Sequence, residues 1–332
     1  MNVKTLLLNK SKVLANHGIE NSRFEAEFLL SFVLYKPREF LLAHEEFEVL
    51  ENEVVKFEKL IERRAIQEPI SQIVGNKEFF GLNFIVTKDT LTPRPETEMM
   101  VEEGISIIKE HCASPLLVLD IGTGSGCIAI SVANKLEKEK VQLDKTSFSA
   151  SDISKEALAI CKKNIAKHEL EGKITLLEGN LLSPALERKM LEGKKTFLVL
   201  ANLPYLSEKI YSKTPVTVKN FEPKTSLYSD EEGLWHYKKL LEELLEIKNE
   251  NPFMKIFALF EISPEQSESV SKLVSKFFPK QKVKFKLQKD LSGRWRMAKL
   301  VILPNNFQRK LLGVIIAFER LGQFCRQNKK KY

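Results

Sequence analysis

The stretch VLDIGTGSGCIAIS, residues 118–131, carries the strongest structural signal in the chain. An apolar run typical of a buried strand ends at Asp120, and Gly122, Gly124 and Gly126 follow it. Glycine permits a positive φ and lets a ligand approach the backbone closely. The apolar residues after the third glycine predict a helix, whose first N–H groups would point toward such a ligand. A ligand site at the end of a buried strand is therefore expected here.

Short apolar runs alternate with helical segments from residue 116 to residue 304. This alternation is typical of a doubly wound, mostly parallel sheet. The segment KDLSGRW between the last two runs leaves no room for a crossover helix, so these runs should form an antiparallel pair. The predicted fold is α/β with seven strands, at LLVLDIG, FSASDIS, ITLLEG, FLVLAN, IFALFEI, VKFKLQ and AKLVIL.

The flanking segments suggest four parts in the chain. Residues 1–75 have helical periodicity and predict a small helical domain, in which Phe24, Phe28, Leu29 and Phe32 share one side of an amphipathic helix. Residues 76–92 contain the alternating run KEFFGLNFIVT, which predicts a β-hairpin linker. The main domain is expected over 93–304, and residues 305–332 predict a basic helical extension.

Composition narrows the class of protein. The chain has 332 residues, of which 43% are hydrophobic and 29% charged, and a formal net charge of +8. The four cysteines show no C-x-x-C spacing and the five histidines no metal-ligand spacing, so no metal site and no disulfide framework is expected. No apolar run has the length of a membrane span. We expect a cytoplasmic monomer without membrane contact.

The glycine spacing indicates which ligand to expect. A dinucleotide fingerprint is G-x-G-x-x-G, whereas this chain has G-x-G-x-G. Asp120 beside the turn would repel a pyrophosphate but attract an ammonium group, and Asp152 after the second strand could bind two ribose hydroxyls. S-adenosylmethionine has a ribose and an ammonium group but no phosphate, so it is the ligand that we expect. The expected sheet is accordingly that of a class I S-adenosylmethionine-dependent methyltransferase. The expected cofactor-binding residues are Asp120, Gly122, Thr123, Gly124, Ser125, Gly126, Asp152, Ile153, Asn180, Leu181 and Asn202.

The tetrapeptide Asn202-Leu203-Pro204-Tyr205 ends the fourth predicted strand, beside the expected cofactor. The Asn202 side-chain oxygen and the Leu203 carbonyl could accept both N–H bonds of a planar –NH₂ group and aim its nitrogen at the methyl donor. Pro204 favours an extended Leu203, and Tyr205 offers a flat face. In isolation the motif would be interpreted as an ordinary turn. Its position beside the expected cofactor favours the catalytic interpretation instead.

Residues 20–304 resemble the release-factor glutamine N5-methyltransferase family. The resemblance is carried by EPISQIVGNKEFFGLNF, TPRPETE joined to the glycine turn, NLPYL, FEISPEQ and KDLSGRWR. It implies that the helical domain docks a class I peptide chain release factor and that the main domain methylates the glutamine amide of its Gly-Gly-Gln motif. Asn202, Leu203, Pro204 and Tyr205 would then be catalytic. Arg94 and Glu96 would line the entrance to the cofactor or substrate site, or would have only a structural function at the start of a helix.

The sequence departs from the family pattern at three positions. Leu203 stands where the family usually has proline, Asn180 where it often has aspartate, and Ser263 where it has glycine. Asn-Leu-Pro-Tyr is also found in ribosomal RNA adenine dimethyltransferases. Alternatives therefore stay open: an N6-adenine methyltransferase acting on ribosomal RNA or DNA, a ribosomal-protein glutamine methyltransferase, or an adapter that has lost catalysis.

Overall fold

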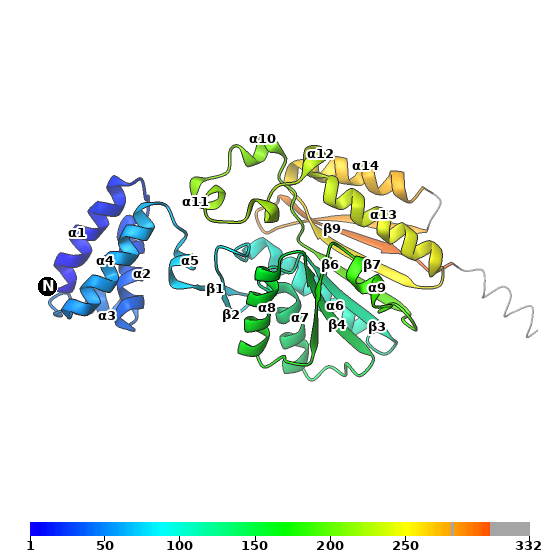
Figure 1. Ribbon diagram of the computed structural model, residues 1–332, viewed down its shortest axis with the longest axis horizontal. Coiled ribbons are helices and arrows are strands. Elements are labelled where there is room, and N and C mark those ends of the chain that lie inside the picture. The colour runs from blue at the N-terminus through cyan, green and yellow to red at the C-terminus, as the bar shows by residue number, and fades with distance from the viewer. Residues whose placement is uncertain (280–281, 306–332) are drawn as a thin grey trace, which may run out of the picture.

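A computed structural model describes residues 1–279 and 282–305 of the chain (Figure 1). The predicted basic extension lies outside the described residues apart from Asn305. Among the residues described, no helix is long and apolar enough to cross a membrane.

The N-terminal part is a group of helices with its own apolar core, at one end of the molecule (Figure 1). Leu6, Leu30 and Phe57 are fully buried in this core. In the second helix Leu29 is buried as expected, whereas Phe24, Phe28 and Phe32 are 49%, 36% and 41% exposed. The core is filled by the leucines beside them, so the phenylalanine row faces outward. The helices are α1 (Val3–Asn16), α2 (Ser22–Leu34), α3 (Arg38–Ala43), α4 (Glu51–Ala65) and α5 (Ile70–Val74).

A β-hairpin follows, formed by β1 (Asn76–Phe79) and β2 (Leu82–Ile85). Phe80 and Gly81 between the strands both have positive φ, which is the geometry of a tight hairpin turn. Asn164 fixes the hairpin to the main domain, because its side chain accepts a hydrogen bond from the Ile85 N–H at 2.7 Å and donates one to the Ile85 carbonyl at 3.0 Å.

The main domain is built on a seven-stranded sheet in the order β5-β4-β3-β6-β7-β9-β8. The first five of these strands in space are parallel, and β9 runs antiparallel to both of its neighbours. The predicted fold, including the antiparallel last pair, is confirmed. The strands are β3 (Leu116–Ile121), β4 (Thr146–Asp152), β5 (Ile174–Glu178), β6 (Thr196–Ala201), β7 (Lys255–Glu261), β8 (Val283–Lys289) and β9 (Trp295–Ile302).

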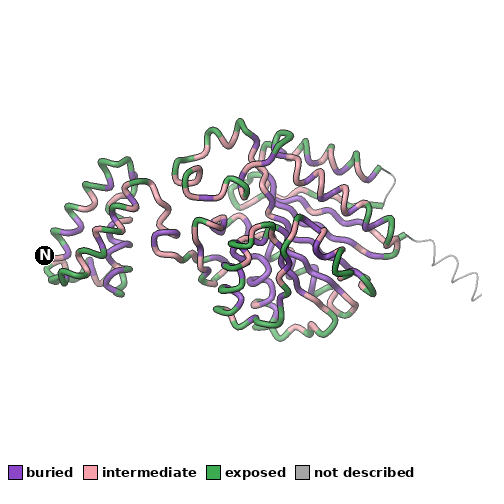
Figure 2. Tube along the Cα trace, in the orientation of Figure 1, coloured by how far each residue is buried: buried purple, intermediate pink, exposed green. Residues whose placement is uncertain are grey.

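Helices cover both faces of this sheet, which explains why its central strands β3 and β6 are buried along their whole length and mostly apolar. Leu116 and Val118 of β3 join the core under one helical layer, and Leu117 and Leu119 join the core under the other. The buried sheet runs through the middle of the main domain in Figure 2. One layer is formed by α6 (Glu98–His111), α7 (Cys127–Lys138) and α8 (Lys155–Lys167), and the other by α9 (Ser183–Glu187), α13 (Trp235–Glu250) and α14 (Ser267–Phe277).

A long connection with little regular structure joins β6 to α13. It passes back over the carboxyl ends of the strands and ends at Gly233, whose φ is +82°. A Cβ on Gly233 would lie 2.1 Å from the Tyr205 carbonyl oxygen, so only glycine fits there. The connection contains α10 (Glu208–Tyr211), α11 (Val216–Lys219), η2 (Lys224–Ser226) and α12 (Asp230–Gly233).

Candidate active site

The glycine turn after β3 has the backbone conformation that its sequence predicts. Gly122, Gly124 and Gly126 have φ values of +65°, +55° and +82°. A Cβ on Gly126 would meet the Cys161 Sγ at 2.6 Å, whereas one on Gly124 would meet no protein atom within 4 Å. The third glycine is therefore required for packing, and the second opens the backbone to a ligand.

Asp120 lies beneath this turn and is fully buried. Its Oδ2 accepts hydrogen bonds from the Thr123 hydroxyl at 2.7 Å and from the Ala129 N–H at 3.2 Å. Burial raises the pKa of this carboxyl to about 7, although both hydrogen bonds favour the ionised form. Asp120 thus connects the turn to the first residues of α7.

Asp152 lies at the end of β4 and braces the turn from the opposite side. Its Oδ2 accepts a hydrogen bond from the Gly124 N–H and its Oδ1 one from the Ser154 N–H, both at 2.9 Å. Burial raises the pKa of Asp152 against the effect of these hydrogen bonds. Each oxygen keeps a lone pair for a further donor.

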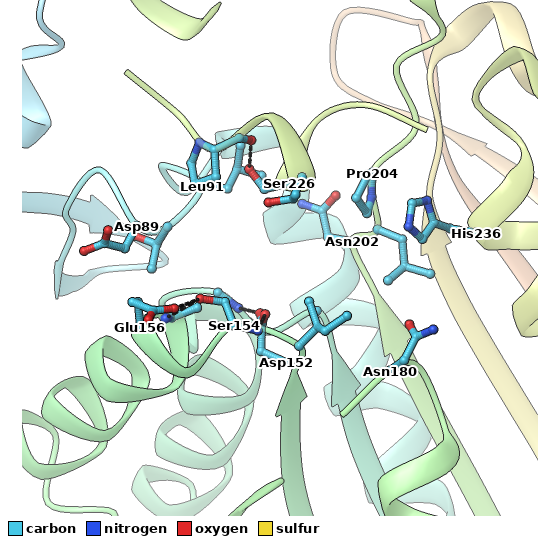
Figure 3. A pocket seen from close by; sticks show the side chains of 18 of the residues that line it. Asp89, Leu91, Asp152, Ser154, Glu156, Asn180, Asn202, Pro204, Ser226 and His236 are labelled. Atoms are coloured by element: carbon cyan, nitrogen blue, oxygen red, sulfur yellow. Dashed lines mark hydrogen bonds between the residues drawn. The ribbon is translucent and has the colours of Figure 1, made fainter. Parts of the chain in front are cut away.

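A cavity of about 350 Å³ lies at the carboxyl ends of β3, β4, β5 and β6. Figure 3 shows Asp152 and Ser154 on one side of it and Asn202, Pro204 and His236 on the other. This is the place where ligands bind in open α/β sheets. The predicted site residues that line it are Gly122, Gly124, Asp152, Ile153, Asn180, Leu181, Asn202, Leu203 and Pro204.

Two side chains at this cavity have features that are common at binding sites. Ile153 is 69% exposed at the cavity wall, where it offers apolar surface to a ligand. Leu181 is buried and has a φ of +47°, a left-handed conformation that costs energy for a residue with a side chain. The cavity therefore combines an open apolar wall with local backbone strain.

The other predicted residues do not line the cavity. Thr123, Ser125 and Gly126 belong to the glycine turn and Asp120 lies beneath it, but none of the four lines the cavity. Tyr205 points its hydroxyl at Glu261 Oε1, at 3.1 Å, and burial raises the pKa of that hydroxyl. These residues support the site from behind.

Arg94 and Glu96 are separated from the cavity and from each other. Arg94 pairs with Glu222, and Glu96 lines a different surface hollow, beside Arg296. The TPRPETE segment reaches the site through Thr97 instead. The Thr97 hydroxyl accepts a hydrogen bond from Asn202 Nδ2 at 3.2 Å.

Comparison with known proteins places this chain in a family. Residues 5–75 match the PrmC N-terminal domain and residues 100–210 the methyltransferase small domain. A release factor glutamine methyltransferase of Clostridium botulinum is 31% identical over 299 residues, which cover 90% of this chain and 99% of that protein. One of Bacillus subtilis is 34% identical, with 84% and 91% covered. The chain belongs to the release factor glutamine methyltransferase family.

Longer relatives match as well. A protein of Rickettsia bellii named bifunctional methyltransferase is 30% identical over 325 residues, which cover 90% of this chain but 55% of that protein. The chain thus spans about half the length of these longer relatives. The resemblance to the glutamine methyltransferase family that the sequence motifs predict is confirmed.

Two residues at this family member's site were not predicted from its sequence: His236 in the cavity wall, and Asn164, which is buried behind the glycine turn. His236 lines the cavity, and its Nδ1 lies 2.9 Å from the Ser229 hydroxyl. Burial lowers the pKa of His236. Asn164 donates to the Ser125 carbonyl at 2.8 Å and so joins the hairpin to the glycine turn. No local pattern marks Asn164, because its partners Ile85 and Ser125 are distant in the chain.

Two loop segments also close over the cavity. Lys88, Asp89, Thr90 and Leu91 come from the segment after the hairpin, and Pro223, Thr225 and Ser226 come from the connection after β6. Glu222-Pro223 suggests a loop over the site from its sequence, whereas the segment after the hairpin carries no such signal. Their contribution to the cavity follows from the way the connection folds back over the sheet.

Proposed function

We propose that the protein transfers a methyl group from S-adenosylmethionine to the side-chain amide nitrogen of the glutamine in the Gly-Gly-Gln motif of class I peptide chain release factors. The observation that carries this proposal is the shared cavity. Its walls combine the open part of the glycine turn with Asn202, Leu203 and Pro204. A methyl donor and a planar nitrogen group could thus be held side by side.

The residues present fit the cofactor. The space over Gly124 is open to a ligand, and the Asp152 carboxylate faces the same cavity with lone pairs free for hydroxyl donors. Ile153 and Leu181 offer apolar contact for an aromatic ring system, and Asn180 offers an amide for its edge. In this proposal Asp120, Thr123, Ser125 and Gly126 hold the turn in shape. When bound, the cofactor supplies an electrophilic methyl group on a sulfonium centre.

The chain's own part in the reaction is to orient the acceptor nitrogen. A glutamine amide is a poor nucleophile because its lone pair is delocalised. The Asn202 side-chain oxygen and the Leu203 carbonyl accept its two N–H bonds, Pro204 restricts Leu203, and Tyr205 supports the motif from behind. Leu203 contributes a backbone carbonyl, so its replacement of the usual proline keeps this function.

The helical domain is proposed to dock the release factor. Its outward row of Phe24, Phe28 and Phe32 offers an apolar surface for a protein partner. Gln72 of α5 connects this domain to the connection over the cavity, because its Nε2 donates to the Phe221 carbonyl at 2.7 Å. We further propose that the protein acts as a monomer in the cytoplasm, where translation terminates.

Transfer of an isotope-labelled methyl group tests the substrate. The protein is incubated with labelled donor and, in separate reactions, with a class I release factor, the same factor with its Gly-Gly-Gln glutamine replaced, ribosomal proteins, and ribosomal RNA. Label should enter only the intact release factor, and mass spectrometry should place it on that glutamine. Label in RNA adenine or in a ribosomal protein alone would assign one of the alternative functions.

A variant of Asn202 tests the proposed mechanism. Asn202→Ala should lower turnover by roughly 100-fold or more, because the acceptor nitrogen loses an oriented oxygen, while donor affinity stays within a few-fold. Asn83→Ala, at an exposed position on β2, is the matched control. Full activity of Asn202→Ala would exclude this residue from the mechanism, and unchanged methylation in cells would favour the adapter hypothesis.

A further inference from the structure

Glu261 is a buried carboxylate next to the catalytic motif. It ends β7 and its side chain is 4% exposed. Its Oε2 accepts a hydrogen bond from the Thr97 hydroxyl at 2.6 Å, and its Oε1 accepts one from the Tyr205 hydroxyl at 3.1 Å. The Tyr237 hydroxyl donates to its backbone carbonyl. Three hydroxyl groups from three segments therefore point at one residue that is not on the cavity wall.

The direction of these hydrogen bonds determines how Asn202 is oriented. A hydroxyl group has one hydrogen, and Thr97 uses it toward Glu261. The Thr97 oxygen can then only accept a hydrogen bond from Asn202, so the –NH₂ end of the amide faces Thr97, at 3.2 Å. The oxygen of the same amide is consequently left free on the other side.

An isolated asparagine amide has no such preference. Its oxygen and nitrogen are similar in size, and the two flipped orientations fill the same space. In the flipped orientation, Asn202 would present its own N–H donors to the cavity. They would repel the N–H groups of the substrate amide that receives the methyl group. An ionised carboxylate can only accept hydrogen bonds. Through the Thr97 hydroxyl, which must donate to it, the Glu261 carboxylate therefore selects one of the two orientations of the Asn202 amide.

We propose that Glu261, acting through Thr97, is a positioning residue that fixes the flip of Asn202 so that the amide oxygen faces the incoming nitrogen. Through Tyr205 it also fixes the far end of the Asn202–Tyr205 motif. This inference rests on the proposed function, since it assumes that Asn202 accepts an N–H bond from the substrate. It gives the TPRPETE segment a function through Thr97, whereas Arg94 and Glu96 lie elsewhere.

The charges around Glu261 suit this function. Burial raises its pKa, while the hydroxyls of Thr97 and Tyr205 and the nearby cation Arg296 favour the ionised form. Glu96 is the nearby charge that acts in the opposite direction. Arg296 is itself held by Asp290, with Nε 3.0 Å from Oδ2.

Variants of Thr97 test the relay. Thr97→Val keeps the shape but removes the hydroxyl, so kcat should fall roughly 10- to 100-fold while the KM for the methyl donor stays within about twofold. Thr97→Ser restores the hydroxyl and should recover most of kcat. Thr196→Val is the matched control. Thr196 is also buried, but it begins β6, at the end of the strand away from Asn202.

A double variant separates the relay from a merely structural effect. Glu261→Gln introduces a donor into the relay and should also lower kcat. If both losses come from the same relay, the kcat of the Thr97→Val and Glu261→Gln double variant should be no more than about threefold below that of the less active single variant. Thermal melting of each variant identifies any that fails to fold. If Thr97→Val does not fold, Glu261→Gln carries the test, and a folded Glu261→Gln variant with the kcat of the wild type would overturn the relay.

The outcomes distinguish this inference from the proposed function. An active wild-type chain with an equally active Thr97→Val variant overturns the relay alone, as do losses that multiply in the double variant. A folded wild-type chain that labels none of the substrates overturns the proposed function and the relay with it. A lowered kcat in Thr97→Val, recovered in Thr97→Ser, supports the relay.

Discussion

Arg94 places its Nη2 between the two carboxylate oxygens of Glu222, at 2.8 and 2.7 Å. Arg94 precedes α6, and Glu222 lies in the connection between β6 and α13. Glu222 is almost fully buried, whereas Arg94 keeps about a third of its side chain exposed. The pair therefore holds the connection over the cavity, next to the lining residues Pro223 and Ser226.

Loss of this cation should destabilise the connection. Arg94→Met leaves the Glu222 carboxylate buried without a partner, which should cost about 1–3 kcal/mol in the free energy of unfolding, less than for a fully buried pair because Arg94 is partly solvated. Urea titration measures the loss, and the KM for the methyl donor should rise. Arg94→Met with Glu222→Gln should recover part of the stability, so equal stability of the single and double variants would contradict this explanation.

The contact between Gln72 and Phe221 should couple the helical domain to the same connection. Gln72→Ala removes a hydrogen bond of 2.7 Å, worth about 1 kcal/mol. Hydrogen exchange in residues 206–229 should become faster, with little change in the helices. Gln67→Ala is the control, because Gln67 makes a hydrogen bond of the same length to His17 within the helical domain. Equal exchange in both variants would mean that the contact does not restrain the connection.

Two glycines of the turn should respond differently to alanine. Gly126→Ala brings a Cβ against Cys161 and Ile130 and should destabilise the protein by a few kcal/mol. The Cβ that Gly124→Ala adds has no protein atom within 4 Å, so only the positive φ should lower the free energy of unfolding, by about 1 kcal/mol. The same Cβ would occupy the space proposed for the methyl donor, so the affinity for the donor should fall strongly. Thermal melting and calorimetric titration with the donor measure the two effects. Unchanged donor affinity in Gly124→Ala would contradict binding over this residue.

Stability should depend on pH through Asp120. Its pKa in the folded protein is about 7, above the ordinary value of 3.8, so folding favours its protonated form. The resulting stabilisation is complete below pH 3.8 and is lost as the pH rises through 7. Relative to Asp120→Asn, the wild-type protein should lose roughly 2–3 kcal/mol between pH 5 and pH 8. Urea titrations across this range measure the difference, and parallel curves would show that Asp120 does not titrate there.

Much of the fold could be predicted because its signals are local. The central strands β3, β6 and β7 are short, mostly apolar runs followed by turn residues. KDLSGRW is too short for a crossover, so the antiparallel β8–β9 pair follows from the length of this segment. The row of phenylalanines in α2 shows the limit of this approach. Periodicity places Phe24, Phe28 and Phe32 on one side but cannot tell which side the leucines of the other helices will cover.

The sequence by itself determined the glycine turn, the Asn202–Pro204 segment and their meeting at one edge of the sheet. These features depend on backbone conformation and on the rule that parallel strands end together. Only the tertiary structure decided what stands behind them, namely the contacts of Thr97 with Glu261 and of Arg94 with Glu222. The two residues of each pair are far apart in the chain, and their hydrogen bonds form only where packing brings a buried carboxylate to its donor, which no local pattern encodes.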